Sequence, residues 1–385
     1  MKLFVQQPNR IALLGCVIAI SSLMFLAFLE LKANRLVAGT GMRVLEITAS
    51  GWWLIGVLVL SFLSAFLTRG FRAPALAVLG NLVLILGIVL IGQNATKLLD
   101  SSSLARVSLA PAAWLTLLAS SFLVFAALND LENAWAKRLT ASLGILVLMV
   151  DLLSGGLSSL SVIREYQTRN QTFWLEVGRH LSLAVFALLF SSLIGIPFGL
   201  WAARSKRIET LVLGFSSLLQ TIPSLALLAL LITPFSALVR AFPSLESLGI
   251  RGIGFAPAIT ALTIYGLLPI VRGVLNGLKA VPEASLEAGR GMGMTAWQLF
   301  IQIEFPLALG LILNGIRTSA VQLVGLSTLS SLIGAGGLGV FIFGGLGSAA
   351  NDLVLLGAIP VLVLAVLTDT AFRGLEQAGI PKGLR

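Results

Sequence analysis

Residues 282–306 read PEASLEAGRGMGMTAWQLFIQIEFP, a polar stretch between apolar segments that are each long enough to cross a bilayer. We expect two short helices in this stretch. Pro282 suits the first turn of a helix, and Gly293 suits its end because glycine tolerates a left-handed backbone. Thr295 and Gln298 have the spacing of a capping box, which begins a second helix running to Pro306. The pattern predicts a structured cytoplasmic surface.

The rest of the chain is too apolar for a soluble globular protein, because 57% of its 385 residues are hydrophobic and only 11% are charged. Apolar segments of about 17 to 25 residues match the roughly 30 Å hydrocarbon core of a bilayer. The sequence therefore predicts an all-α, polytopic membrane protein with about ten transmembrane helices. The expected spans are 11–29, 50–67, 75–92, 110–128, 139–155, 181–203, 211–235, 255–275, 305–330 and 353–371. The first is expected to be retained, since no small-residue cleavage site follows it.

The basic residues report the orientation of these spans. The basic residues behind the net charge of +10 are scattered among short loops, which argues against a nucleic-acid partner, whereas the apolar spans predict membrane lipid as a partner. Short loops such as RSKR at 204–207 carry Lys and Arg most densely, and such loops stay in the cytoplasm. We expect both termini and the 282–306 stretch on that side.

Several classes of function are disfavoured by residues that the chain lacks. One cysteine, Cys16, and one histidine, His180, leave no disulfide framework, no metal site and no catalytic constellation for a membrane-embedded enzyme. No Gly-x4-Gly-Lys-Ser/Thr pattern occurs, so the chain is not expected to bind ATP as a cofactor. A secondary transporter would need an internal repeat and membrane-embedded carboxylates, and neither is evident.

The spacing in 282–306 resembles the EAA loop of ATP-binding cassette (ABC) importer permeases of type I. That motif is Glu-Ala-Ala, three residues, Gly, nine residues, Ile, one residue, Leu-Pro. Gly replaces the second Ala and Phe replaces Leu, two changes that conserve size or polarity. The matching positions here are Glu287, Ala288, Gly289, Gly293, Ile303, Phe305 and Pro306.

The resemblance implies a division of labour between chains. The ATPase is a separate nucleotide-binding subunit, and the loop docks on it as a coupling helix. Glu287 would supply a charged contact, Ala288 and Gly289 a close approach, and Gly293 the bend. It also implies an extracytoplasmic substrate-binding protein, a second permease core that is either the same chain or a paralogue, and a place in the bacterial inner membrane.

Other strings resemble the permeases of osmoprotectant importers, which carry glycine betaine, choline, carnitine or proline betaine. They are QTIPSLALLALL (220–231), YGLLPIVRGVLNGLKAVP (265–282), LSTLSSLIGAGGLG (326–339) and GSAANDLVLLGAIPVLVLAVLTD (347–369). The alternatives are an ABC importer for another small solute, such as an amino acid or an alkyl sulfonate, and a secondary transporter.

The resemblance covers residues 170–372 and leaves the first five spans outside it. Together with the predicted spans it divides the chain into four expected segments. They are an N-terminal bundle of about five helices at 1–155 with no assigned function, a polar connector at 156–180, a permease core at 181–372 and a cytoplasmic tail at 373–385.

Polar residues inside the spans indicate the translocation path, because such groups are costly at membrane depth unless they face a cavity or a partner. Arg317 either pairs with a carboxylate, helps to gate the path or extends to the cytoplasmic interface. The other path residues that we predict are Ser319, Gln322, Gln220, Thr221 and Tyr265. Pro223 and Pro269 lie near the last three and favour breaks in the helical backbone.

Two glycine patterns have structural interpretations. Gly334, Gly336 and Gly339 match the dinucleotide-binding spacing G-x-G-x-x-G but lie in no βαβ unit, so we expect a tightly packed or flexible external turn. Gly195 and Gly199 lie four apart around Pro197, which predicts close helix packing and a kink.

Overall fold

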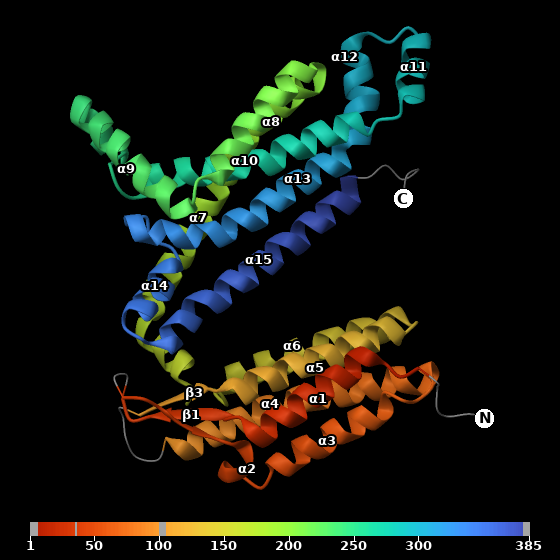
Figure 1. Ribbon diagram of the computed structural model, residues 1–385, viewed down its shortest axis with the longest axis vertical. Coiled ribbons are helices and arrows are strands. Elements are labelled where there is room, and N and C mark those ends of the chain that lie inside the picture. The colour runs from red at the N-terminus through yellow and green to blue at the C-terminus, as the bar shows by residue number, and fades with distance from the viewer. Residues whose placement is uncertain (1–6, 35–36, 100–104, 380–385) are drawn as a thin grey trace. The chain divides into compact units, whose positions relative to one another are not determined.

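A computed structural model describes residues 7–34, 37–99 and 105–379, which fold into two compact units. The first unit comprises Met1–Thr168 and the second Arg169–Arg385. Most of the described chain is helical, which confirms the predicted helical membrane fold (Figure 1). The last six residues of the predicted tail lie outside the described residues.

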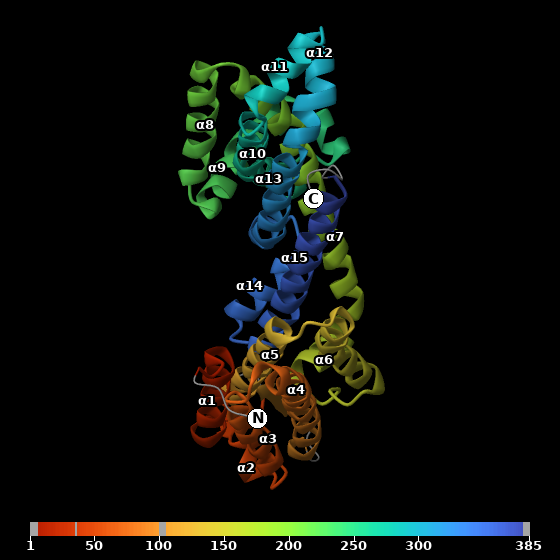
Figure 2. The same ribbon diagram turned by 90° about the vertical axis from the view of Figure 1, so that its right-hand side faces the viewer.

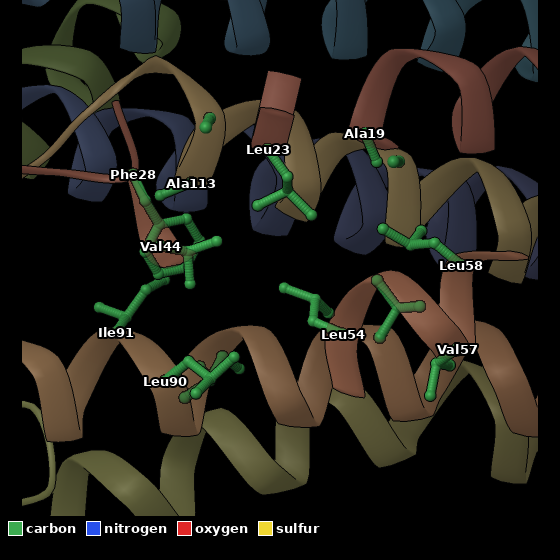
Figure 3. Packing of buried hydrophobic residues seen from close by; sticks show 14 of the residues in the cluster. Ala19, Leu23, Phe28, Val44, Leu54, Val57, Leu58, Leu90, Ile91 and Ala113 are labelled. Atoms are coloured by element: carbon green, nitrogen blue, oxygen red, sulfur yellow. The ribbon is translucent and has the colours of Figure 1, made fainter. Parts of the chain in front are cut away.

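The first unit is a helical bundle. Its helices are α1 (Arg10–Phe25), α2 (Val44–Ile47), α3 (Gly51–Ser64), α4 (Arg69–Leu98), α5 (Pro111–Asp130) and α6 (Ala134–Ser154). Figure 3 shows side chains from α1, α3 and α4 meeting in its core, including the buried Leu23, Leu54 and Leu58. Helices associate in lipid by close packing rather than by escape from water. Accordingly a Cβ on Gly80 of α4 would lie only 2.9 Å from the Cβ of Leu123 on α5.

A small antiparallel sheet joins the helix ends on one side of this bundle. Strand β1 (Leu29–Lys32) lies between β2 (Thr40–Met42) and β3 (Arg106–Leu109). The sequence patterns did not predict these strands, because segments of three or four residues are too short to show a period of two. Opposite the sheet, Arg72 and Asp130 tie α4 to α5 by a 2.7 Å ion pair.

The second unit contains the remaining helices. Helix α7 (Ser161–Arg204) enters it from the first unit, with a non-helical residue at Arg169. The segment 156–180, which was predicted to be a polar connector, is thus mostly helical. The kink predicted at Pro197 is found instead at Arg169, and the helix continues through Pro197. The other helices are α8 (Lys206–Thr221), α9 (Ser224–Ala241), η1 (Pro243–Leu248), α10 (Phe255–Lys279), α11 (Glu283–Gly291), α12 (Ala296–Leu299), η2 (Phe300–Glu304), α13 (Phe305–Leu326), η3 (Ser327–Ile333), α14 (Gly339–Gly347) and α15 (Asn351–Gly379).

Helix α10 is the centre of the second unit, and small residues bring its neighbours close. It lies beside α13, where Gly273 faces Gly315 (Figures 1 and 2). On α7, a Cβ on Gly195 would lie 3.1 Å from Ile270, and one on Gly199 would lie 2.6 Å from Val274. The close packing predicted for these two glycines is confirmed.

Each predicted span contains a helix of the structure, with one difference. Among the described residues, seven helices are long and apolar enough to cross a membrane, and α1 and α3 are shorter apolar helices. The span predicted at 211–235 is two helices, α8 and α9, separated at Ile222 and Pro223. Proline has no N–H for the helical ladder and biases the preceding residue away from the helical region, which explains the break.

Candidate functional site

The 282–306 loop begins with a well-capped helix. Pro282 is the N-cap of α11 rather than its first residue, and Gly293 has the expected left-handed φ of +77°. Gly293 N–H donates to the carbonyl of Arg290 at 2.9 Å, and Met294 N–H donates to that of Gly289 at 3.2 Å. These two bonds form a Schellman motif, which satisfies carbonyls that the helix end leaves free. The helix therefore ends where the glycine predicts.

The second half of the loop is a continuous helical segment leading into the core. Thr295 and Gln298 form the predicted capping box at the start of α12. A π turn, η2, follows, in which the N–H of Phe305 donates to the carbonyl of Phe300. Pro306 comes next and cannot donate to the carbonyl four residues back, so a wider turn is favoured locally.

Gly289 lies inside the loop rather than on its surface. It is buried, and a Cβ there would lie 2.6 Å from Cδ1 of Leu299 and 2.8 Å from Cδ1 of Ile303. The close approach that this glycine permits is therefore to its own chain. Gly289, at the second Ala position of the motif, packs against Ile303 at the Ile position, and this contact holds α11 against the segment α12–η2.

Four other residues of the loop are exposed. Glu287 and Ala288 are exposed, and Met292 and Trp297 are each 69% exposed. We call these four residues the exposed face. Within the described residues Glu287 forms no hydrogen bond or ion pair, unlike Glu283, which pairs with Arg290 at 2.9 Å. An unpaired carboxylate beside exposed apolar side chains is typical of a contact surface.

An ion pair ties the end of the loop to α7. Glu304 pairs with Arg204 of α7 at 3.3 Å, and the guanidinium of Arg204 also lies 5.9 Å from the ring of Phe300. Just before the loop, Lys279 at the end of α10 pairs with Glu209 of α8 at 2.6 Å. A displacement of the loop would therefore be passed to α7 directly and to α8 through α10.

A polar pocket lies among α8, α10 and α13. Its volume is about 320 Å³, and its apolar wall includes Leu268 and Leu311. The polar side chains that line it are Gln220, Arg272, Asn276, Asn314 and Thr318. The last four occur in pairs four apart on α10 and α13, and this i, i+4 pattern of polar residues in apolar helices is the signal by which sequence analysis could have found them.

Gln220 lines this pocket, whereas Thr221 and Tyr265 do not. Pro269 cannot donate to the carbonyl of Tyr265, and the Gln220 side chain donates to that oxygen at 2.9 Å. The hydroxyl of Tyr265 donates in return to the carbonyl of Ile222, at the break between α8 and α9. Thr221 donates to its own helix, at the carbonyl of Leu218. These bonds satisfy carbonyls near Pro223 and Pro269, as polar groups in a membrane require. The break predicted at Pro269 is absent, because α10 continues through this proline and the Gln220 side chain replaces the missing donor.

The remaining predicted path residues lie outside the pocket. Arg317 pairs with Asp369 at 3.0 Å and Glu376 at 2.7 Å, so of its alternatives the structure shows pairing with carboxylates. Ser319 is buried and donates to the carbonyl of Gly266 on α10 at 3.0 Å. Gln322 is half-buried on α13. Arg317 and Ser319 thus join helices of the core.

The glycine-rich turn is packed against α7, through residues that sequence analysis did not select. Gly336 and Gly337 have left-handed φ values of +80° and +91°. Gly337 N–H donates to the buried carboxylate of Glu176, and that carboxylate also pairs with Arg179. Of the two expected forms the tightly packed turn is present. The sequence signal for this contact is the pair Glu176 and Arg179, two opposite charges three residues apart just before the apolar part of α7.

Two family models match the chain. The binding-protein-dependent transport system inner membrane component matches residues 195–378, which include the loop and the pocket. The N-terminal domain of the ABC transporter permease YehY matches residues 8–163.

Curated relatives match the second half of the chain. The carnitine transport permease protein OpuCB of Listeria monocytogenes is 40% identical over 225 residues, covering 58% of this chain and 96% of that protein. The glycine betaine/carnitine/choline transport system permease protein OpuCB of Bacillus subtilis is 37% identical, covering 57% and 94%. The osmoprotectant import permease protein OsmW of Salmonella typhimurium is 39% identical, covering 54% and 91%. The chain therefore belongs to the family of binding-protein-dependent transport system inner membrane components, the permease subunits of ABC importers.

Proposed function

We propose that this chain is the permease of an ATP-driven importer of compatible solutes, the class that includes glycine betaine, choline, carnitine and proline betaine. As an ABC importer permease it is a multi-pass inner-membrane protein whose ATP hydrolysis is performed by a separate ATPase, with a substrate-binding protein as the other general partner. The solute class is supported by relatives whose names carry these solutes and which this chain matches over almost their whole length.

The exposed face of the loop carries the coupling part of the proposal. A groove on the ATPase would receive Trp297 and Met292 as apolar anchors, and Glu287 would pair with a basic residue there. The buried contacts of Gly289 and Ile303 keep α11 and α12 together, so the face moves as one body. Closure of two ATPase subunits around ATP would then rock two permease cores between inward-facing and outward-facing states.

The orientation follows from the same assignment. The loop must face the cytoplasm to meet an ATPase, and the lysines and arginines of the short loops support that placement. Both termini are then cytoplasmic. The second core is either another copy of this chain or a paralogue.

Uptake of radiolabelled glycine betaine into vesicles tests the proposal. The vesicles hold this permease, its ATPase and its binding protein, and wild type is compared with Glu287→Arg. The matched control is Glu132→Arg, which reverses an exposed carboxylate of the first unit that has no partner among the described residues. We expect ATP-dependent uptake that Glu287→Arg abolishes and Glu132→Arg leaves intact.

Other outcomes separate the alternatives. Uptake without ATP would indicate a secondary transporter. ATPase binding without uptake of any betaine would indicate an importer for another solute. Normal uptake by Glu287→Arg would exclude the coupling role of that residue.

A further inference from the structure

Arg272 lies in the polar pocket, on helix α10 and within the span predicted at 255–275. It precedes Lys279, the last residue of α10, by seven positions, which places it about 10 Å along the helix axis from that end. An arginine at such a depth is costly unless it pairs or faces a water-filled cavity. Arg272 is exposed to the pocket, and in the described part of the chain it has no carboxylate partner.

Arg317, the arginine in a comparable position on α13, shows what a structural role requires. Its side chain is 23% exposed, and two carboxylates of α15 neutralise it. Asn314, three residues before it on the same helix, and Thr318, the next residue, face the pocket instead. Arg317 is therefore neutralised within the chain, whereas the charge of Arg272 is available to a molecule in the pocket.

The other side chains of the pocket are suited to a carboxylate. Thr318 donates to the carbonyl of Asn314 at 2.9 Å and lies 3.4 Å from its side-chain oxygen, which leaves the amide N–H groups of Asn314 free to donate. Asn276 adds a second amide. None of the described residues that line the pocket is acidic. Hydrogen bonds from a guanidinium to a carboxylate are among the strongest in proteins.

We infer that this pocket is a selectivity site for solutes that carry a carboxylate, with Arg272 as the residue that binds it. The inference rests on the proposed function. Zwitterions such as glycine betaine, carnitine and proline betaine present a carboxylate to Arg272 and their methyl groups to the apolar wall at Leu268 and Leu311. Choline has a cation but no carboxylate, so Arg272 repels it without compensation. The permease thus prefers betaines to choline independently of the binding protein.

The test compares initial rates of ATP-driven uptake of labelled glycine betaine and labelled choline. Each permease is reconstituted with the same ATPase and with one binding protein that accepts both solutes, so the preference of the binding protein cancels between variants. The variants are Arg272→Gln, Arg272→Lys and Asn314→Ala. The control is Arg207→Gln, which removes an exposed arginine of α8 that lies outside the pocket and, in the part of the chain that the structure describes, has no partner. Protein level and thermal unfolding are measured for every variant.

We expect Arg272→Gln to lower the ratio of glycine betaine uptake to choline uptake about tenfold, the effect of losing one charge-assisted hydrogen bond. Arg272→Lys should retain most of the preference, and Asn314→Ala should lower the ratio in the same direction. Arg207→Gln should leave it unchanged. An unchanged ratio in both Arg272→Gln and Asn314→Ala, with betaine uptake still driven by ATP, overturns the inference and leaves the proposed function standing. Wild type that imports neither solute overturns the proposed function and this inference together.

Discussion

Replacement of Gly315 by alanine tests how tightly α13 is packed on α10. A Cβ at this position would lie 2.7 Å from the carbonyl oxygen of Pro269 and 2.8 Å from the Cα of Gly273. Carbon atoms in contact prefer about 3.5–4.0 Å, so the helices must separate by about 1 Å. Overpacking of this kind costs about 1–3 kcal/mol.

Gly325→Ala is the matched control, because it lies on the same helix and its added Cβ would meet nothing within 4 Å. Alanine in a helix is favoured over glycine by about 0.5–1 kcal/mol, and this gain applies to both variants. The difference between them therefore isolates the overpacking cost of about 1–3 kcal/mol.

Thermal unfolding of the purified permease in lipid nanodiscs measures the effect. We expect Gly315→Ala to unfold at a lower temperature than wild type, and Gly325→Ala at the same or a higher temperature. Where unfolding is irreversible, the half-life at a fixed temperature replaces the midpoint. Equal stability of the two variants would refute the argument that contact between Gly273 and Gly315 sets the distance between these helices.

Two further predictions concern polar groups of the core. Gln220→Ala should cost about 1–3 kcal/mol of stability, because the carbonyl of Tyr265 loses its hydrogen-bond donor. The same substitution should cost little in a Pro269→Ala background, because the backbone N–H at position 269 can then donate to this carbonyl. Thermal unfolding of the four proteins checks this, and an equal cost in both backgrounds would contradict it. Arg317→Ala should lower stability by about 1–3 kcal/mol. This is less than the loss expected for a fully buried ion pair, because Arg317 and Glu376 are both partly exposed. The betaine-to-choline uptake ratio should stay unchanged. A changed ratio in folded Arg317→Ala protein would place this residue on the path.

The features that sequence predicted correctly depend on neighbouring residues. Gly293 and the pair Thr295 and Gln298 determine the local backbone whatever surrounds them, so the two helices of the loop could be read from the chain. The break at Pro223 is local for the same reason.

The features that sequence missed depend on residues far apart in the chain. The strand Arg106–Leu109 pairs with Leu29–Lys32 across three intervening helices, and nothing in either segment names its partner. Arg317 is neutralised by carboxylates of α15, which lie 52 or more residues beyond it in the chain. Arg272 has no such carboxylate among the described residues. Which arginine is neutralised is therefore a property of the packed core.

The π turn at Phe300–Glu304 also determines how the end of the loop is rotated about the axis of the membrane helix that follows it. It holds one residue more than an α-helical turn, and one residue corresponds to about 100° of rotation. If the turn relaxed to an ordinary α-helix, the segment bearing Trp297 would rotate by that angle about the axis of α13. The direction in which this chain presents its exposed face is thus encoded next to Pro306, a residue that does not belong to the face itself.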